Sequence, residues 1–245
     1  MKVLAWNIRR GGSVGQALAP AIVLHNPDVI VLCEFRERSQ RLLDELRFLG
    51  WAHAATSPVS GPINGVAIAS KLPFDVRPAP FGEPPFDRWG IELVVSPDLT
   101  LIGVYAPLAS SLASSPTIQQ DFWNTLHRIA EERQHERVLL IGDFNTGATG
   151  TDCPVPVPCA DAFDHLSTLG WVDAWRLCNP DSNDFSFVHH VNGESSNWRI
   201  DHAFVSPPLA DNVTSCWYSH DERERWASDH SMLLIKIDEK PMKRR

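Results

Sequence analysis

The chain has 245 residues, a net charge of −8, nine tryptophans and a hydrophobic content of 43%, which is enough for a sizeable core. Proteins that coat nucleic acid nonspecifically are normally basic, so the acidic balance argues against that class. The apolar runs stay well short of the roughly 20 residues that a membrane-spanning helix needs, and we expect no membrane span.

In chain order, the first half predicts a strand at 3–6, a helix at 16–25, a strand at 29–33, a helix at 38–49 and strands at 66–69, 74–76, 91–95 and 101–105. The second half predicts a helix at 117–134, a strand at 138–141, a helix at 162–169 and strands at 185–188, 200–205, 213–218 and 232–237. Strands outnumber helices and both occur throughout, which predicts a layered α/β domain.

The chain contains no Gly/Ser-rich linker, repeat or low-complexity tract that would divide it. Polar motifs run from Asn7 to His230, so a single site needs both ends of the chain. We therefore expect one domain over residues 1–238, followed by a charged, frayed tail over residues 239–245.

The cysteines and the start of the sequence bear on cellular location. Met1 and Lys2 lead directly into an apolar run, without the pattern of a signal peptide. The five cysteines are scattered, and only Cys153 and Cys159 lie close together, in a Pro-rich stretch. A disulfide between these two is one interpretation, but the scatter favours reduced thiols in a cytoplasmic enzyme. We expect the protein to be cytoplasmic and monomeric.

Six short motifs place polar side chains mostly at the ends of apolar runs. They are Trp6-Asn7-Ile8-Arg9, Cys33-Glu34, Gly103-Val104-Tyr105-Ala106-Pro107, Gly142-Asp143-Phe144-Asn145, Trp198-Arg199-Ile200-Asp201-His202 and Ser228-Asp229-His230-Ser231. Each motif alone is weak. Together, their carboxylates, amides, phenol and imidazole can hold a divalent cation, bind a phosphate and activate a water molecule.

Two of these motifs carry a chemical argument of their own. Glu34 follows a buried strand and is either a solvated residue or a ligand well placed for a hard cation such as Mg²⁺. Asp143 and Asn145 are either an Asx turn or a catalytic pair. In an extended segment, residues two apart point the same way, so the carboxylate can take a proton from water while the amide steadies the water or the phosphate.

In their order and composition, the six motifs resemble those of the endonuclease/exonuclease/phosphatase superfamily over nearly the whole chain. The nearest pattern is that of the exonuclease III type of abasic-site endonuclease. The resemblance implies a four-layer sandwich, in which two face-to-face β-sheets are flanked by helices and the site lies at one edge. It also implies that activity depends on Mg²⁺ or Mn²⁺.

The same resemblance assigns the metal ligands and the general base. It makes Glu34 the main metal ligand and places Asp229 near the metal. It makes Asp143 the general base, with Asn145 orienting the water and Asn7 supporting the pair by hydrogen bonding.

The remaining motif residues are expected to face the phosphate. By resemblance, His230 contacts the scissile phosphate, and Asp201 fixes the tautomer of His230. Tyr105 is expected beside the phosphate as a hydrogen-bond donor or proton source. His202 follows Asp201 on the opposite strand face and is expected to point away from the site.

Three apolar residues, two of them aromatic, are informative about the substrate. Phe187, Trp198 and Ile200 lie where abasic endonucleases carry an aromatic residue and a Trp that wall the pocket for a flipped, base-free sugar. The alternative is that these side chains are ordinary core residues.

The leading hypothesis is therefore a divalent-metal-dependent phosphodiesterase acting on DNA, as an abasic-site endonuclease, a 3′-exonuclease or both. Two departures from the family pattern favour a same-fold hydrolase of a small phosphoester, such as a phospholipid headgroup, an inositol phosphate or a nucleotide. Arg9 stands where the family often carries Asn, Asp or Gln, and Leu108 opens a neutral stretch where many DNA-repair members are basic. A binding protein with an inactive site is the third hypothesis, and the complete set of expected side chains argues against it.

Overall fold

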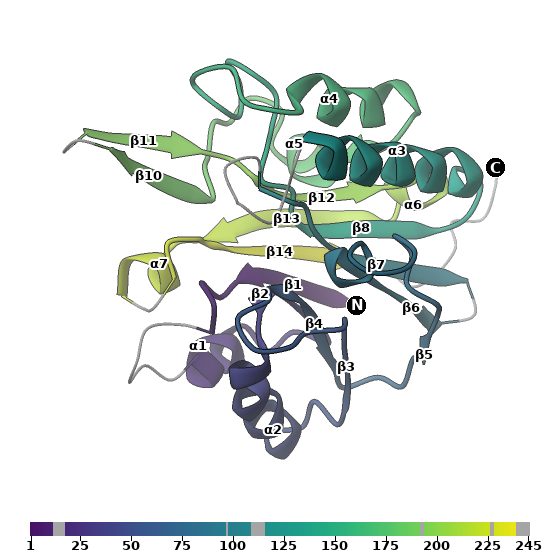
Figure 1. The fold of residues 1–245 in the computed structure, drawn as a ribbon, viewed down its shortest axis with the longest axis vertical. Helices are drawn as coiled ribbons and strands as arrows, with labels where there is room; N and C mark the ends of the chain where they lie inside the picture. Colours follow the sequence, from purple (N-terminus) through teal and green to yellow (C-terminus); the bar gives the residue numbers. More distant parts are fainter. Residues whose placement is uncertain (12–17, 97, 109–115, 192–193, 226–227, 239–245) are drawn as a thin grey trace.

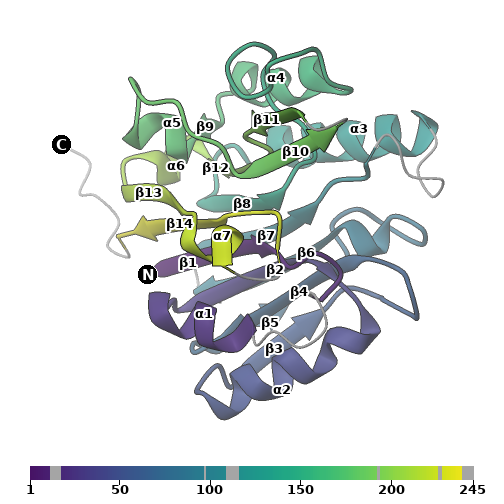
Figure 2. The same ribbon diagram turned by 90° about the vertical axis from the view of Figure 1, so that its left-hand side faces the viewer.

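Two β-sheets lie face to face, with helices covering both outer faces (Figures 1 and 2). The structure is a computed structural model, and it describes residues 1–11, 18–96, 98–108, 116–191, 194–225 and 228–238. The predicted four-layer α/β sandwich is confirmed.

The first sheet is built from both ends of the chain. Its six strands lie in the order β13 (Val213–Ser219), β14 (Met232–Ile237), β1 (Lys2–Asn7), β2 (Val29–Phe35), β4 (Gly65–Ser70) and β3 (His53–Thr56). Strand β1 pairs antiparallel with β14 and parallel with β2. The N-terminal motif, the Glu34 motif and the C-terminal motif are thereby brought onto neighbouring strands.

The second sheet carries the central motifs. Its order is β5 (Asp75–Val76), β6 (Gly90–Ser96), β7 (Leu99–Tyr105), β8 (Val138–Asp143), β12 (Asp201–Val205) and β9 (Val172–Asp173). Strand β8 is parallel to β7 and antiparallel to β12, so Asp143 lies in register with Tyr105 on one side and Asp201 on the other. A separate hairpin, β10 (Phe187–Val191) and β11 (Glu194–Trp198), projects beyond the sheets (Figure 1).

Alternation along the strands explains the layers. Val29 and Val31 of β2 belong to the core between the sheets, whereas Ile30 and Leu32 face the outer helices. Because both faces are covered, this strand is a continuous apolar run. Helices α1 (Leu18–His25) and α2 (Gln40–Phe48) cover the first sheet, and α3 (Pro116–Arg133) and α4 (Ala160–Thr168) cover the second (Figure 1).

The predicted elements all have a counterpart, with small shifts at their ends. The strand expected at 185–188 begins at Phe187, and the one expected at 200–205 begins at Asp201. The helix predicted at 38–49 begins as a 3-10 turn at Glu37–Ser39 and continues as α2. The unpredicted elements are short or polar: strands β3, β9 and β11, helices α5 (Ala174–Cys178), α6 (Pro207–Ala210) and α7 (Asp221–Arg225), and a 3-10 turn at Asp87–Trp89. The expected tail at 239–245 lies outside the described residues, as do residues 16–17 of the first predicted helix.

Two further expectations concern the described residues as a whole. None of the helices found there is long and apolar enough to cross a membrane. All five cysteines, including Cys153 and Cys159, are free thiols in the structure.

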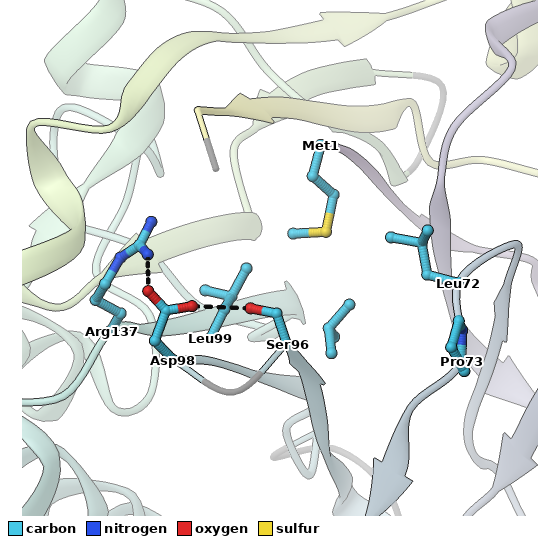
Figure 3. Close-up of a pocket in the computed structure, with 8 residues that line it drawn as sticks. Met1, Leu72, Pro73, Ser96, Asp98, Leu99 and Arg137 are labelled. Carbon is cyan, nitrogen blue, oxygen red and sulfur yellow. Dashed lines mark hydrogen bonds and ion pairs between the residues drawn. The ribbon is translucent and has the colours of Figure 1, made fainter. Parts of the chain in front are cut away.

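A pocket of about 330 Å³ lies at the edge where β1, β7 and β8 begin and β4 and β6 end, and it is lined by Met1, Leu72, Pro73, Val95, Ser96, Asp98, Leu99 and Arg137 (Figure 3). Within it, Asp98 pairs with Arg137 at 2.5 Å and accepts a hydrogen bond from Ser96 at 3.0 Å. Leu99 begins β7 and Arg137 immediately precedes β8, whereas Tyr105 and Asp143 end those strands. The pocket therefore lies at the edge opposite the predicted site and contains none of its residues.

Candidate active site

The ends of β1 and β8 meet through a side-chain hydrogen bond. Asn7 Nδ2 donates to Asp143 Oδ2 at 2.8 Å. The C-terminal motif closes on the same point, because Ser228 Oγ donates to the Asn7 carbonyl at 2.5 Å and accepts from the His230 backbone at 3.1 Å. Trp6 Nε1 donates to the His230 carbonyl at 2.9 Å. The structure thus brings together the first, fourth and sixth motifs.

Asp143 is fully buried at the end of β8. The preceding Gly142 has φ +147°, and a Cβ there would lie 2.0 Å from the Val104 carbonyl oxygen, so only glycine allows this approach of β8 to β7. Burial, followed by the negative charge of Asp201, raises the pKa of Asp143 to about 7. A carboxyl group with this pKa can exchange a proton near neutral pH.

The backbone at Asn145 differs from the extended conformation that we expected from the sequence. Strand β8 ends at Asp143, and Asn145 has φ +51°, so the two side chains do not share an extended segment. The Asn145 backbone N–H donates to Asp143 Oδ1 at 2.8 Å, which is the Asx turn of the alternative reading. The Asn145 amide donates to the Ala106 carbonyl at 2.7 Å. Asn145 therefore orients Asp143 through its backbone and anchors the segment after β7 through its side chain.

His230 and Asp201 form a buried pair. Nδ1 of His230 lies 2.8 Å from Asp201 Oδ2, which directs Nε2 away from this carboxylate. Burial lowers the pKa of His230, but the charge of Asp201 and its hydrogen bond outweigh burial and raise the pKa to about 10. The charges of Asp143 and Asp229 act in the same direction. The buried Asp201 carboxylate therefore favours the imidazolium form of His230.

This pair predicts a pH dependence of stability. The unfolded pKa of histidine is about 6.5 and that of folded His230 is higher, so its contribution is fully present below about pH 6.5 and is lost as pH rises through about 10. Asp201→Asn should remove this contribution. The stability difference between wild type and variant should then shrink as pH rises from about 6.5 to about 10, measured by urea unfolding in EDTA. A difference that stays constant over this interval would contradict the assigned pair.

Tyr105 lies beside Asp143 on the neighbouring strand. Its ring is buried, with its centroid 5.6 Å from that of Trp89, and its hydroxyl accepts a hydrogen bond from Asn64 Nδ2 at 3.1 Å. Burial, together with the charges of Glu34 and Asp143, raises the pKa of Tyr105 well above its usual value. Tyr105 therefore remains a neutral phenol, which can donate a hydrogen bond.

Glu34 and Asp229 are the two carboxylates that pair with the Arg9-Arg10 dipeptide. Glu34 has φ +56° at a bulge within β2, and a positive φ in a residue other than glycine is unusual and concentrates at functional sites. Arg10 Nε lies 3.9 Å from Glu34 Oε2, and Arg9 Nε lies 3.6 Å from Asp229 Oδ2. Each of the two carboxylates therefore has one exposed arginine as an ion-pair partner.

Two sets of side chains compete as cation ligands. Ligand atoms of Asp143, Asp201 and His230 lie within 4.8 Å of one another. Each Asp143 oxygen already accepts one N–H group, Asp201 Oδ2 bonds to His230, and a protonated His230 has no free lone pair, so this set offers a cation fewer free lone pairs. Within the described part of the chain, the Glu34 and Asp229 carboxylates accept no hydrogen bond, so their oxygens suit a hard cation better.

The aromatic residues predicted to line a sugar pocket lie at the base of the hairpin. Phe187 and Trp198 are directly paired across β10 and β11. The Phe187 ring centroid lies 4.8 Å from that of His230, which brings Phe187 to the site. Trp198 is half-buried and donates from Nε1 to Ser196 Oγ at 2.6 Å. Ile200 is buried at 6% exposure, closer to a core residue than to a pocket wall.

Sequence reasoning missed a buried ion-pair cluster beside the site. Arg199, 1% exposed, donates to Asp152 at 2.8 Å and to Asp173 at 2.7 Å, and so ties the link between β11 and β12 to the segment after β8 and to β9. A buried arginine carries no sequence signal that separates it from a surface one. His202 packs nearby, with Nε2 3.0 Å from the Thr146 carbonyl, and as expected it is not part of the network around Asp143.

The two-sheet sandwich carries carboxylates, an imidazole and a phenol at one edge, a set of groups that can act in acid–base chemistry. The model of the Endonuclease/Exonuclease/phosphatase family matches residues 4–230, and the chain belongs to this family. The predicted family is confirmed, and the similar solved structures are named as hydrolytic nucleases and a phosphatase.

Several known proteins are similar over the whole chain. An AP endonuclease from Archaeoglobus fulgidus has a TM-score of 0.82 and 22% identity, covering 97% of this chain and 99% of that one. NExo from Neisseria, described as a 3′-5′ exonuclease and as a 3′ phosphatase bound to a product DNA hairpin, has TM-scores of 0.75 and 0.77 and identities of 25% and 26%, over 97% of this chain and 100% and 99% of those chains.

A curated relative is longer than this chain. Recombination repair protein 1 of Drosophila melanogaster is 24% identical over 258 residues, which cover 96% of this chain and 37% of that protein. The chain therefore spans a little over a third of that relative.

Proposed function

We propose that this chain is a Mg²⁺- or Mn²⁺-dependent phosphodiesterase that hydrolyses DNA phosphodiester bonds, as an abasic-site endonuclease, a 3′-exonuclease or both. The observation that carries the proposal is one hydrogen-bonded network, in which Asp143 is held by Asn7 and His230 by Asp201, with Tyr105 alongside. This network combines a base with two hydrogen-bond donors at a single edge of the sandwich.

The buried network suggests how phosphorus is attacked. Asp143 accepts a proton from water at one of its oxygens, while Asn7 and the Asn145 backbone hold its carboxylate in place. The His230 imidazolium and the Tyr105 phenol donate hydrogen bonds to the non-bridging phosphate oxygens, where negative charge increases in the transition state. Asp201 keeps His230 protonated and oriented.

The donor set fits a hard divalent cation. Glu34 and Asp229 would hold it, since their carboxylate oxygens accept no hydrogen bond within the described residues. When bound, the cation supplies positive charge that offsets the charge on the phosphate and the leaving oxygen. Arg9 stands near Asp229, at a position where a carboxylate could have been a further ligand.

The similar proteins support DNA as the substrate class. NExo, at 25–26% identity over nearly the whole chain, was solved with a product DNA hairpin, and the Drosophila relative is named as a recombination repair protein. In this chain, Phe187 lies against His230 and pairs across the hairpin with Trp198, and the two aromatic side chains would provide an apolar surface for a base-free sugar.

Trp198→Ala tests the abasic-site assignment. Only an abasic substrate presents an extruded sugar, so cleavage of an abasic duplex should fall at least about tenfold more than hydrolysis of bis(p-nitrophenyl) phosphate. If Trp198 is only packing, both rates should fall together, and stability should drop by about 3–5 kcal/mol. Both rates and the melting temperature are measured on one protein. Phe48→Ala, at a 91% exposed position on α2, is the matched aromatic control.

A small phosphoester is the second candidate substrate. The net charge of −8 and the exposed Arg9 and Arg10 beside Asp229 and Glu34 suit a compact anion better than a long duplex. On this alternative, the wild-type protein turns over the small phosphodiester, and Trp198→Ala causes no selective loss of abasic-duplex cleavage.

We further propose a cytoplasmic monomer in which residues 1–238 act as one catalytic domain. The pairing of β14 with β1 supports the single domain, because the last described strand completes the sheet that the first strand begins. The network around Asp143 needs only residues of one chain, which supports a monomer, and the free thiols suit a reducing compartment.

A further inference from the structure

A chain of hydrogen bonds outside the proposed machinery ends on Tyr105. Arg36, which follows β2, donates from Nε to Asn64 Oδ1 at 2.5 Å. Asn64, which precedes β4, donates from Nδ2 to Tyr105 Oη at 3.1 Å. Three segments that are far apart in sequence thus converge on one hydroxyl group.

The chemistry of these groups fixes the direction of every hydrogen bond. A guanidinium has N–H groups and no acceptor, so Asn64 must present its oxygen to Arg36. The amide nitrogen of Asn64 then faces Tyr105, and because that nitrogen only donates, the phenol oxygen must accept. The phenol hydrogen is therefore left for an acceptor other than Asn64.

Packing restricts the phenol further. The Tyr105 ring is 6% exposed and lies against the buried Trp89, over whose ring the Arg88 guanidinium stacks at 4.3 Å from the centroid. With the ring held, rotation of the hydroxyl group is the remaining freedom. A phenol hydrogen prefers the ring plane, which offers two directions, and the Asn64 donor occupies one of them.

We propose that Arg36 and Asn64 are positioning residues that fix Tyr105 as a hydrogen-bond donor to the substrate phosphate. The inference rests on the proposed function and extends it, because it assigns to two residues outside the six motifs the task of aiming one donor. Arg36 acts through Asn64, and Asn64 acts through Tyr105.

Asn64→Asp reverses the last hydrogen bond without a change in side-chain size. A carboxylate only accepts, so the Tyr105 hydrogen would turn toward residue 64 and away from the phosphate. The new carboxylate would pair with Arg36, which favours a folded variant. We expect kcat to fall by about 10²-fold with little change in KM, as for loss of one donor to a developing charge.

A double-mutant cycle separates aiming from general damage. With an abasic duplex oligonucleotide and Mg²⁺ as the probe, Asn64→Asp should have no further effect on kcat in a Tyr105→Phe background, because no hydroxyl remains to be aimed. Additive losses would overturn the proposal. Arg36→Lys, which keeps a donor-only partner, should retain most activity, and Arg41→Gln on the exposed surface of α2 is the matched control.

Tyrosine NMR tests the relay without activity. The chain has two tyrosines, and Tyr218, which donates to the Asp201 carbonyl at 2.6 Å, is an internal reference. In metal-free protein labelled with ¹³C at tyrosine Cζ, Asn64→Asp should shift the Tyr105 signal and leave that of Tyr218 in place. No shift at Tyr105 would overturn the relay, whereas a wild-type protein inert toward every phosphoester would overturn the proposed function alone.

Discussion

Asp143→Asn is expected to lower kcat by at least about two orders of magnitude without destabilising the fold. An amide cannot accept the proton that the base must take from water. The folded protein disfavours the charged form of Asp143, whose pKa burial and Asp201 raise to about 7. A neutral amide should therefore relieve a cost, which offsets the loss of about 1 kcal/mol from the hydrogen bond with Asn7.

The pH dependence gives this prediction a second check. The folded pKa of Asp143 lies above the unfolded value of about 3.9, so its effect on stability grows less favourable as pH rises from about 4 to about 7. The stability of Asp143→Asn relative to wild type should thus increase over this interval, measured by urea unfolding in EDTA. Asp44→Asn, at a 60% exposed position, is the control that should change neither quantity. A large fall in melting temperature for Asp143→Asn would make Asp143 a structural residue.

Glu34→Gln should reduce activity by about 10²-fold or more and weaken Mg²⁺ binding by about tenfold or more. A neutral amide is a poorer ligand than a carboxylate for a hard cation, and the remaining carboxylate, Asp229, does not replace it. The side chains are nearly identical in size, so the bulge in β2 and the fold should survive. Calorimetric titration of Mg²⁺ measures the affinity directly.

A matched control excludes a general effect of removing one negative charge. Glu45→Gln on α2 removes a charge that pairs with Arg41 on the surface, and it should leave both Mg²⁺ affinity and turnover unchanged. Unchanged Mg²⁺ affinity in Glu34→Gln would remove Glu34 from the metal shell.

The sequence predicts those strands well that are buried on both faces of a sheet, because such strands are continuous apolar runs. The strand at 29–33 and the carboxylate after it were predicted because Val, Ile and Leu fill both faces of β2. The motif at Asp143 was predicted in the same way. The family resemblance predicts that the motifs meet around one site, and the family match over residues 4–230 confirms the family itself.

The sequence does not predict features that depend on local backbone conformation or on contacts between distant segments. The direction of the Asn145 side chain depends on a left-handed turn that the extended-strand argument does not anticipate. Strand β11 is polar along most of its length because the hairpin lies outside the core, so it has no apolar alternation to detect. Asn64 contacts Tyr105 only because β4 and β7 meet in the sandwich, across 41 positions in sequence.

The central claim is that the edge around Asp143 hydrolyses DNA phosphodiester bonds with a divalent cation. The most direct measurement compares cleavage of abasic duplex, intact single-stranded DNA, RNA and bis(p-nitrophenyl) phosphate side by side, in Mg²⁺ and in EDTA, by wild type and Asp143→Asn. The account predicts cleavage of DNA that requires Mg²⁺, is fastest on the abasic duplex or at a 3′ end, and is lost in the variant. Turnover confined to the small phosphodiester, or DNA cleavage that persists in EDTA or in Asp143→Asn, would contradict it.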